Sequence, residues 1–158
     1  MTKHQNLLKW NVSDLAKAMK ISEEDVKNYF KDGRRASFII ERLIAYKVFH
    51  GSLSSNEGTD YDIIDNEGGK WEVRSLTKDG VYFCPSYMVG SGRDFDEVGF
   101  LTKLNNIKGY VIADITKFPN IPFWIIPKSK VMSWWKKKLL GSTTKISRQK
   151  ALKLFNEI

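Results

Sequence analysis

The sequence predicts a mixed α/β protein, with helices toward both ends and a mixed sheet of the α+β kind between them. Three observations predict this class: helical spacing of apolar residues in the first 51 positions, short strand patterns between glycine turns over 60–85, and two unbroken apolar runs within 109–127. A chain of 158 residues with 42% hydrophobic content can bury one core. We expect an N-terminal helical segment at 1–35 and a core with C-terminal helices at 36–158.

Capping signals mark the first helices. Ser13 or Asp14 is the expected cap of the first helix, and Ser22 that of the second, which ends at an Asp-Gly pair. A glycine stop ends the third helix. The three predicted helices cover residues 13–20, 23–31 and 36–51.

Strands come next. The turns NEGG and TKDG separate three short strand-like runs, which predicts an antiparallel meander. An amphipathic helix then precedes two apolar strands, the first expected to be buried on both faces, and two helices close the chain. The predicted strands cover residues 60–65, 70–76, 80–85, 109–115 and 121–127, and the later helices cover 93–107, 128–140 and 147–155.

Charge and cysteine content limit the possible functions. Lys and Arg outnumber Asp and Glu by 26 to 18, giving a formal charge of +8 and a pI near 9.5. This favours a polyanionic partner, with nucleic acid as the first candidate. The N-terminus lacks the pattern of a secretory signal and no apolar run has spanning length, so we expect a cytoplasmic protein without a membrane partner. The single cysteine, Cys84, cannot form an internal disulfide and is expected in the core.

The stretch YDIIDNEGGKWEVRS carries the functional signal. In a strand, Lys70, Glu72 and Arg74 share one face, and a hairpin turn brings Asp62 and Asp65 back toward them. Two carboxylates beside cations then become available for metal and phosphate chemistry. The alternative is a solvated strand face with ordinary cross-strand ion pairs.

The order of helix, acidic hairpin, third strand, crossover helix and further strand resembles the PD-(D/E)xK nucleases. Within that superfamily the hairpin is most similar to the small, homodimeric type II restriction endonucleases. Asp62 matches the first acid of the motif, Glu72 the second, and Arg74 stands where a lysine is usual. The resemblance implies a restriction-endonuclease-like core, Mg²⁺-dependent hydrolysis of double-stranded DNA, a homodimer, and a cognate methyltransferase acting on the same site.

The chemistry of these residues agrees with that implication. The carboxylates of Asp62 and Glu72 and the backbone carbonyl of Val73 offer hard oxygen ligands to Mg²⁺. Arg74 can clamp a phosphate but cannot accept a proton, and Lys70 would supply a second cation. Activity therefore depends on the metal generating the nucleophile.

Two further acids have alternative interpretations. Glu41 interrupts an apolar helical stretch, and members of the superfamily often supply an extra acid from that helix, so it is a candidate catalytic residue. Its alternative is a solvated position paired with Arg42. Asp65 is either another metal ligand or a residue that caps the turn, and the turn interpretation is favoured.

The segment DLAKAMKISEEDVKNYF resembles a helix-turn-helix, whose second helix would enter the major groove. Three acids at the start of that helix oppose contact with phosphates, so a packing or dimerisation pair is the alternative. The loop SYMVGSGR is a second candidate DNA contact, or an ordinary connection. The candidate DNA-binding residues are Lys27, Asn28, Lys31, Arg34, Arg35, Ser86, Tyr87 and Arg93.

Two other functions remain open at this point. A noncatalytic DNA-binding protein could retain a nuclease-like core, because Arg74 departs from the motif. A structure-specific repair or mobile-element nuclease would use the same site without sequence preference.

Overall fold

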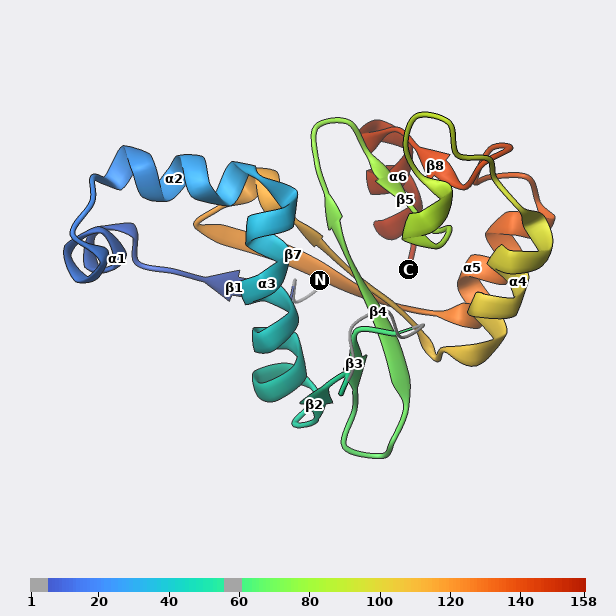
Figure 1. The fold of residues 1–158 in the computed structure, drawn as a ribbon, viewed down its shortest axis with the longest axis horizontal. Coiled ribbons are helices and arrows are strands. Elements are labelled where there is room, and N and C mark those ends of the chain that lie inside the picture. The colour runs from blue at the N-terminus through green and yellow to red at the C-terminus, as the bar shows by residue number, and fades with distance from the viewer. Residues whose placement is uncertain (1–5, 56–60) are drawn as a thin grey trace.

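The computed structural model describes residues 6–55 and 61–158, and its mixed α/β architecture confirms the predicted class (Figure 1). Its central sheet has six strands, and among their pairings only β4 with β6 is parallel. In spatial order the strands are β1 (Leu7–Lys9), β7 (Asn120–Pro127), β6 (Gly109–Asp114), β4 (Lys70–Leu76), β3 (Ile63–Ile64) and β2 (Ser52–Leu53).

Two groups of helices lie on opposite sides of this sheet (Figure 1). The first group is α1 (Val12–Met19), α2 (Glu23–Lys31) and α3 (Gly33–Leu43), which a π-helical turn (Ile44–Val48) extends. The second group is α4 (Glu97–Asn106), α5 (Lys128–Lys136) and α6 (Arg148–Phe155). Within the described ranges, none of these helices is long and apolar enough to cross a membrane.

The helix boundaries correct some predicted caps. Asn11, not Ser13 or Asp14, caps α1, since its side chain accepts the Asp14 amide. Ser22 caps α2 as predicted. Asp32 caps α3, because its carboxylate accepts the amides of the next turn; the Asp-Gly pair therefore starts a helix as well as ending one. As a result α3 crosses the predicted domain boundary after residue 35.

The predicted meander is correct for its first hairpin and wrong for its third strand. β3 and β4 pair antiparallel, with Ile63 opposite Trp71. After a tight turn, β5 (Val81–Tyr82) leaves the sheet and pairs with β8 (Lys145–Ile146) from near the C-terminus. The free side of β4 is taken by β6 instead. β1, β2 and β8 were not predicted.

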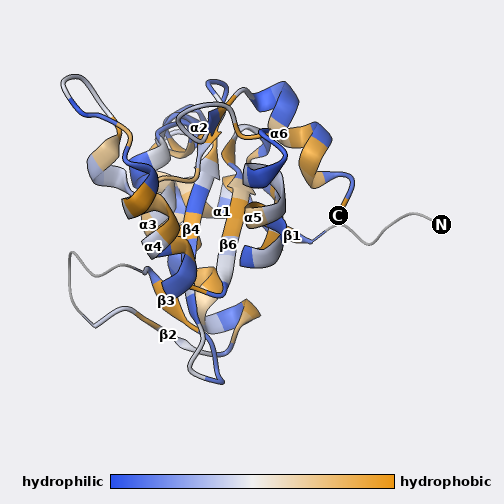
Figure 2. Ribbon diagram, turned by 90° about the vertical axis from the view of Figure 1, so that its right-hand side faces the viewer, coloured by the Kyte–Doolittle hydropathy of each residue, from blue (hydrophilic) through white to orange (hydrophobic). Residues whose placement is uncertain are grey.

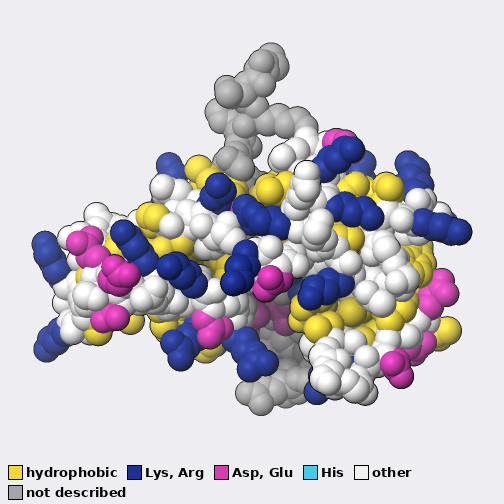
Figure 3. All heavy atoms as spheres, turned by 90° about the horizontal axis from the view of Figure 1, so that it is seen from above, with side chains coloured by type: hydrophobic (Ala, Val, Ile, Leu, Met, Phe, Trp, Pro, Cys, Tyr) yellow, Lys and Arg dark blue, Asp and Glu magenta, His cyan; other side chains and the backbone are white. Residues whose placement is uncertain are grey.

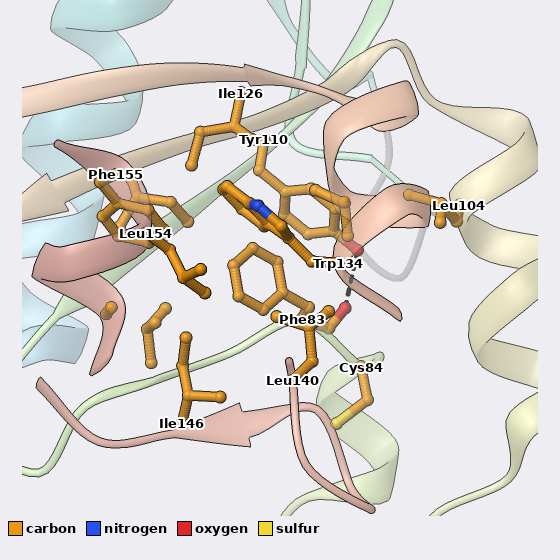
Figure 4. Close-up of a cluster of buried hydrophobic side chains, with 14 of the residues drawn as sticks. Phe83, Cys84, Leu104, Tyr110, Ile126, Trp134, Leu140, Ile146, Leu154 and Phe155 are labelled. Atoms are coloured by element: carbon orange, nitrogen blue, oxygen red, sulfur yellow. Dashed lines mark hydrogen bonds between the residues drawn. The ribbon is translucent and has the colours of Figure 1, made fainter. Parts of the chain in front are cut away.

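Two apolar clusters hold the layers together, one on each side of the sheet. β6 contributes to both and every one of its residues is buried, as predicted for a strand covered on both faces (Figure 2). In the cluster beneath α5 and α6, Phe83 packs edge-on against Tyr110, whose hydroxyl donates to the Phe83 carbonyl at 2.6 Å (Figure 4). Cys84 is also buried there, which confirms it as a core residue, and so is Trp134.

Candidate functional site

The base of the site is an edge of β4 that no strand of the described residues covers. β3 pairs with β4 only as far as Trp71, and the Asp62 amide still donates to the Trp71 carbonyl at 3.0 Å. Two residues further along β4, the Asp62 side chain replaces the missing strand: its Oδ2 accepts the Val73 amide at 2.8 Å. The backbone of β4 therefore fixes this carboxylate at the open edge.

The same bond orients the Val73 carbonyl. In a strand, the N–H and C=O of one residue point to the same side, so the carbonyl of Val73 also points toward the edge that Asp62 occupies. A carboxylate and a backbone carbonyl thus lie together, as the sequence predicted.

Glu72 lies beside them but is deeply buried, with only 4% of its surface exposed. Its Oε1 receives Arg74 Nη2 at 2.8 Å and Lys103 Nζ at 3.0 Å, whereas its Oε2 is buried without a hydrogen-bond partner in the structure. Burial raises the pKa of Glu72, and the nearby cation of Arg74 offsets part of that effect. One oxygen of this buried carboxylate therefore lacks a compensating group among the described residues.

Arg74 is held on three sides. Besides Glu72, it donates to the Cys84 carbonyl at 3.2 Å, and its guanidinium lies over the Tyr82 ring, 4.7 Å from the centroid. Only 10% of its side chain is exposed. The interpretation of a solvated strand face is therefore wrong for Glu72 and Arg74. Lys70 does not join them, because it is exposed and lies over the ring of Tyr61.

A cavity of about 240 Å³ opens where α3 faces this edge. It brings together five sequence-predicted residues from separate elements, and Glu72 is not among those that line it: Arg34 and Glu41 of α3, Asp62 before β3, and Val73 and Arg74 of β4. Hydroxyl and amide groups complete its wall. The lining residues are Gly33, Arg34, Ser37, Glu41, Asp62, Val73, Arg74, Ser75, Thr77 and Tyr82.

Glu41 belongs to this cavity rather than to a solvated helix face. Its neighbour Arg42 instead donates to the Phe38 carbonyl at 2.9 Å and lies over the Phe38 ring. Burial raises the pKa of Glu41 to about 7, and the nearby charge of Asp62 adds to the rise. Glu41 therefore changes its charge near neutral pH.

Asp65 stabilises the turn between β3 and β4. Its Oδ1 accepts the amides of Glu67 and Gly69 at 2.9 and 2.7 Å, and its Oδ2 accepts the Trp71 indole N–H at 2.8 Å. Desolvation opposes ionisation, but these hydrogen bonds, the indole first, lower the pKa of Asp65 to about 2. The favoured interpretation of Asp65 agrees with this geometry, and the residue does not line the cavity.

The donor set fits a hard divalent cation. Among the described residues, no three Asp, Glu, His or Cys side chains form a ready metal-binding group. The fit depends instead on two carboxylates, Asp62 and Glu72, and on the Val73 carbonyl, together with the unpaired buried Oε2 of Glu72. Mg²⁺ commonly binds through one or two carboxylates and keeps several waters, so these donors suffice.

The candidate DNA contacts lie in three places. Lys27, Asn28 and Lys31 are exposed on α2, on a face along which Lys and Arg are widespread (Figure 3). Arg34 and Arg35 are exposed in the first turn of α3, not in the second helix of the predicted pair, and Arg34 reaches the cavity.

The third place is the loop before α4. Ser86 and Tyr87 are exposed in a single 3₁₀ turn. Arg93 donates to the Ser86 and Val89 carbonyls at 3.2 and 3.3 Å, so this side chain closes its own loop. Both alternatives for the loop, a DNA contact and an ordinary connection, are compatible with these bonds.

Sequence reasoning missed Lys103, the second cation on Glu72. A signal was present, because Lys103 follows Phe100 by three positions and therefore shares the buried side of α4. Tyr82 and Ser37 were also missed, and nothing in their local sequence marks them.

Comparison with known proteins does not assign the chain to a family or a known fold. No family model matches the chain, no curated protein matches it, and no solved structure matches it.

Proposed function

We propose that this protein is a Mg²⁺-dependent endonuclease that hydrolyses phosphodiester bonds in double-stranded DNA, of the site-specific type II restriction class. The observation that carries the proposal is the bond from the Val73 amide to Asp62, which fixes a carboxylate at an open strand edge beside Glu72. The cavity at this edge contains a cation, Arg74, and a third acid, Glu41.

Each residue would have a distinct part in the reaction. Asp62, Glu72 and the Val73 carbonyl would hold Mg²⁺, which when bound lowers the pKa of a water and stabilises charge on the phosphoryl oxygens. Arg74 would bind the scissile phosphate, because its guanidinium is fixed by Cys84 and Tyr82 and stays protonated. Glu41 would exchange protons with the attacking water, since its pKa is near 7.

DNA would be held by the basic surfaces on either side of the cavity. In this proposal the pair α1 and α2 is a helix-turn-helix that presents Lys27, Asn28 and Lys31. Arg34 and Arg35 would contact the backbone close to the scissile bond, and the loop with Ser86, Tyr87 and Arg93 would make a further contact. Lys70, away from the cavity, would add only nonspecific affinity.

Two copies would be needed to cut both strands of a palindromic site, so the proposal includes a homodimer on DNA. A methyltransferase of the same specificity would protect the host genome. Sedimentation of the protein with and without a DNA duplex tests the dimer.

Plasmid cleavage tests the proposal. Supercoiled DNA is incubated with Mg²⁺ or with EDTA, using the wild type, Asp62→Asn, and Glu67→Gln as a matched control. Glu67 lies in the same hairpin with 80% of its side chain exposed. Discrete fragments that need Mg²⁺, vanish in Asp62→Asn and persist in Glu67→Gln support a site-specific nuclease.

Other outcomes separate the alternatives. A smear that depends on Asp62 would indicate a repair or mobile-element nuclease without sequence preference. Metal-independent binding without cleavage would overturn the catalytic proposal in favour of a noncatalytic DNA-binding protein. That result would mean that the ion pair of Glu72 with Arg74 only stabilises the fold.

A further inference from the structure

Lys103 reaches the site from a different element than the hairpin. It lies on α4, and its Nζ is 3.0 Å from Glu72 Oε1, the same oxygen that Arg74 contacts at 2.8 Å. Only 10% of its side chain is exposed. One oxygen of Glu72 thus carries two cations while the other, Oε2, is buried without a partner among residues 6–55 and 61–158.

The two cations are held very differently. Arg74 has two further contacts, with the Cys84 carbonyl and the Tyr82 ring. For Lys103, the described part of the chain provides only the contact with Glu72. A lysine side chain is flexible, and its ammonium is a compact charge with no fixed direction of bonding. Lys103 can therefore leave Glu72, whereas Arg74 is anchored.

The charges around Glu72 determine when Lys103 would leave that carboxylate. Glu72 is buried and lies near the negative charge of Asp62, so the ammonium of Lys103, 3.0 Å from Glu72 Oε1, lowers the cost of holding Glu72 ionised. A divalent cation on Glu72 would repel the ammonium at short range, because like charges a few ångströms apart in a buried site interact strongly. The released ammonium then needs an anion. Lys103 does not itself line the cavity, but Arg74, which shares Glu72 Oε1 with Lys103, does, so a DNA phosphate bound beside Arg74 is the nearest anion available to it in the proposed complex.

We propose that Lys103 is an exchangeable counter-ion, paired with Glu72 in the metal-free protein and transferred to a substrate phosphate when a divalent cation binds. The inference rests on the proposed function. In this proposal Lys103 joins Arg74 as a second cation that binds phosphate. Glu72 is then neutralised by Lys103 before the metal binds and by the metal afterwards.

Metal affinity without DNA is the first test. Mn²⁺ alone is titrated into the protein and free Mn²⁺ is counted by electron paramagnetic resonance. Lys103→Met should bind Mn²⁺ more tightly than the wild type, by about three- to tenfold, the size expected for removing one competing ion pair. Lys103→Arg keeps the charge and should stay close to the wild type.

Lys108→Met is the matched control, because Lys108 pairs with the hairpin acids Asp65 and Glu67 and not with Glu72. It should leave Mn²⁺ affinity unchanged. Lys103→Gln, which retains a hydrogen-bond donor to Glu72, provides a second variant if Lys103→Met unfolds. Equal or weaker Mn²⁺ binding by folded Lys103→Met and Lys103→Gln would overturn the exchange.

Cleavage at saturating Mg²⁺ is the second test. Lys103→Met should cleave plasmid more slowly although it binds metal more tightly, a combination of opposite effects that a purely structural role would not produce. Unchanged cleavage would overturn the transfer to phosphate. If the wild type does not cleave DNA at all, the proposed function fails, while the Mn²⁺ titration still decides whether Lys103 competes with a cation for Glu72.

Discussion

Two buried acids on neighbouring strands, Glu72 of β4 and Asp114 of β6, have opposite surroundings. Arg148 binds Asp114 with two hydrogen bonds, at 2.7 and 2.6 Å, and the Thr116 hydroxyl donates to it at 2.6 Å. Both oxygens of Asp114 are thereby satisfied. Glu72 has two cations on one oxygen and no partner on the other.

Their acidities differ accordingly. Burial alone would raise the pKa of Asp114, but the hydrogen bonds from Arg148 and Thr116 lower it below its ordinary value. Burial raises the pKa of Glu72, and its cations do not fully offset that rise. A satisfied buried acid stabilises the fold, whereas an incompletely satisfied one next to residues that line a cavity, as Val73 and Arg74 do, is a candidate for a ligand.

Glu72→Gln should have the largest effect, and the effect should be on activity. Glutamine keeps the shape and one acceptor oxygen but loses the charge that holds a metal. We expect plasmid cleavage to fall at least about a thousandfold, or about 4 kcal/mol of transition-state stabilisation. The pKa of Glu72 is raised, so its ionised form gains less from its cations than burial costs, and the free energy of unfolding, measured with urea, should fall less than in Asp114→Asn, where the pKa is lowered. A large fall in the free energy of unfolding with unchanged cleavage would mean that Glu72, like Asp114, stabilises the fold and does not serve the site.

Asp114→Asn should have the opposite profile. It leaves Arg148 with a neutral partner in a site where the acid is 1% exposed, so the free energy of unfolding should fall by about 3 kcal/mol. Cleavage per folded molecule should not change. Asp79→Asn, an exposed acid in the turn after β4, is the control and should alter neither quantity. Reduced cleavage by fully folded Asp114→Asn would mean that both acids serve the same site.

The hairpin of the site could be predicted because its geometry is local. The alternation of Glu72 and Arg74 on one face, and a two-glycine turn that returns Asp62 toward them, follow from the period of a strand and from turn chemistry. The burial of the charged face did not follow from the pattern. It depends on α4 and on the segment around Cys84, which cover β4 from elsewhere in the fold.

The errors in the predicted fold also arise from contacts between segments that are far apart in the sequence. β5 has apolar alternation that suits a meander, but its partner β8 follows much later in the chain, and no local signal marks that pairing. Lys103 likewise becomes a partner of Glu72 only when the crossover helix packs on the sheet. The cap of α1 was missed for a simpler reason, since Asn11, Ser13 and Asp14 are all good caps within one turn.

Glu41 offers the smallest and most specific test, because its pKa of about 7 makes stability depend on pH. The folded-state pKa is raised above its ordinary value of 4.5, so the stabilising contribution is complete below about 4.5 and is lost as pH rises through about 7. Glu41→Gln removes that loss. In metal-free protein the variant should be more stable than the wild type by about 1–2 kcal/mol above pH 8, a value reduced for the partial exposure of the carboxylate.

The advantage of Glu41→Gln should shrink steadily as pH falls toward 4.5, because the wild-type carboxyl is then protonated in both states. Urea unfolding across this pH range measures it, with Glu67→Gln as the exposed control that should show no such trend. An advantage of the same size at every pH would show that Glu41 is not a titrating acid of this cavity. A trend that Mg²⁺ abolishes would place Glu41 with Glu72, among the acids that a cation neutralises, and apart from Asp114.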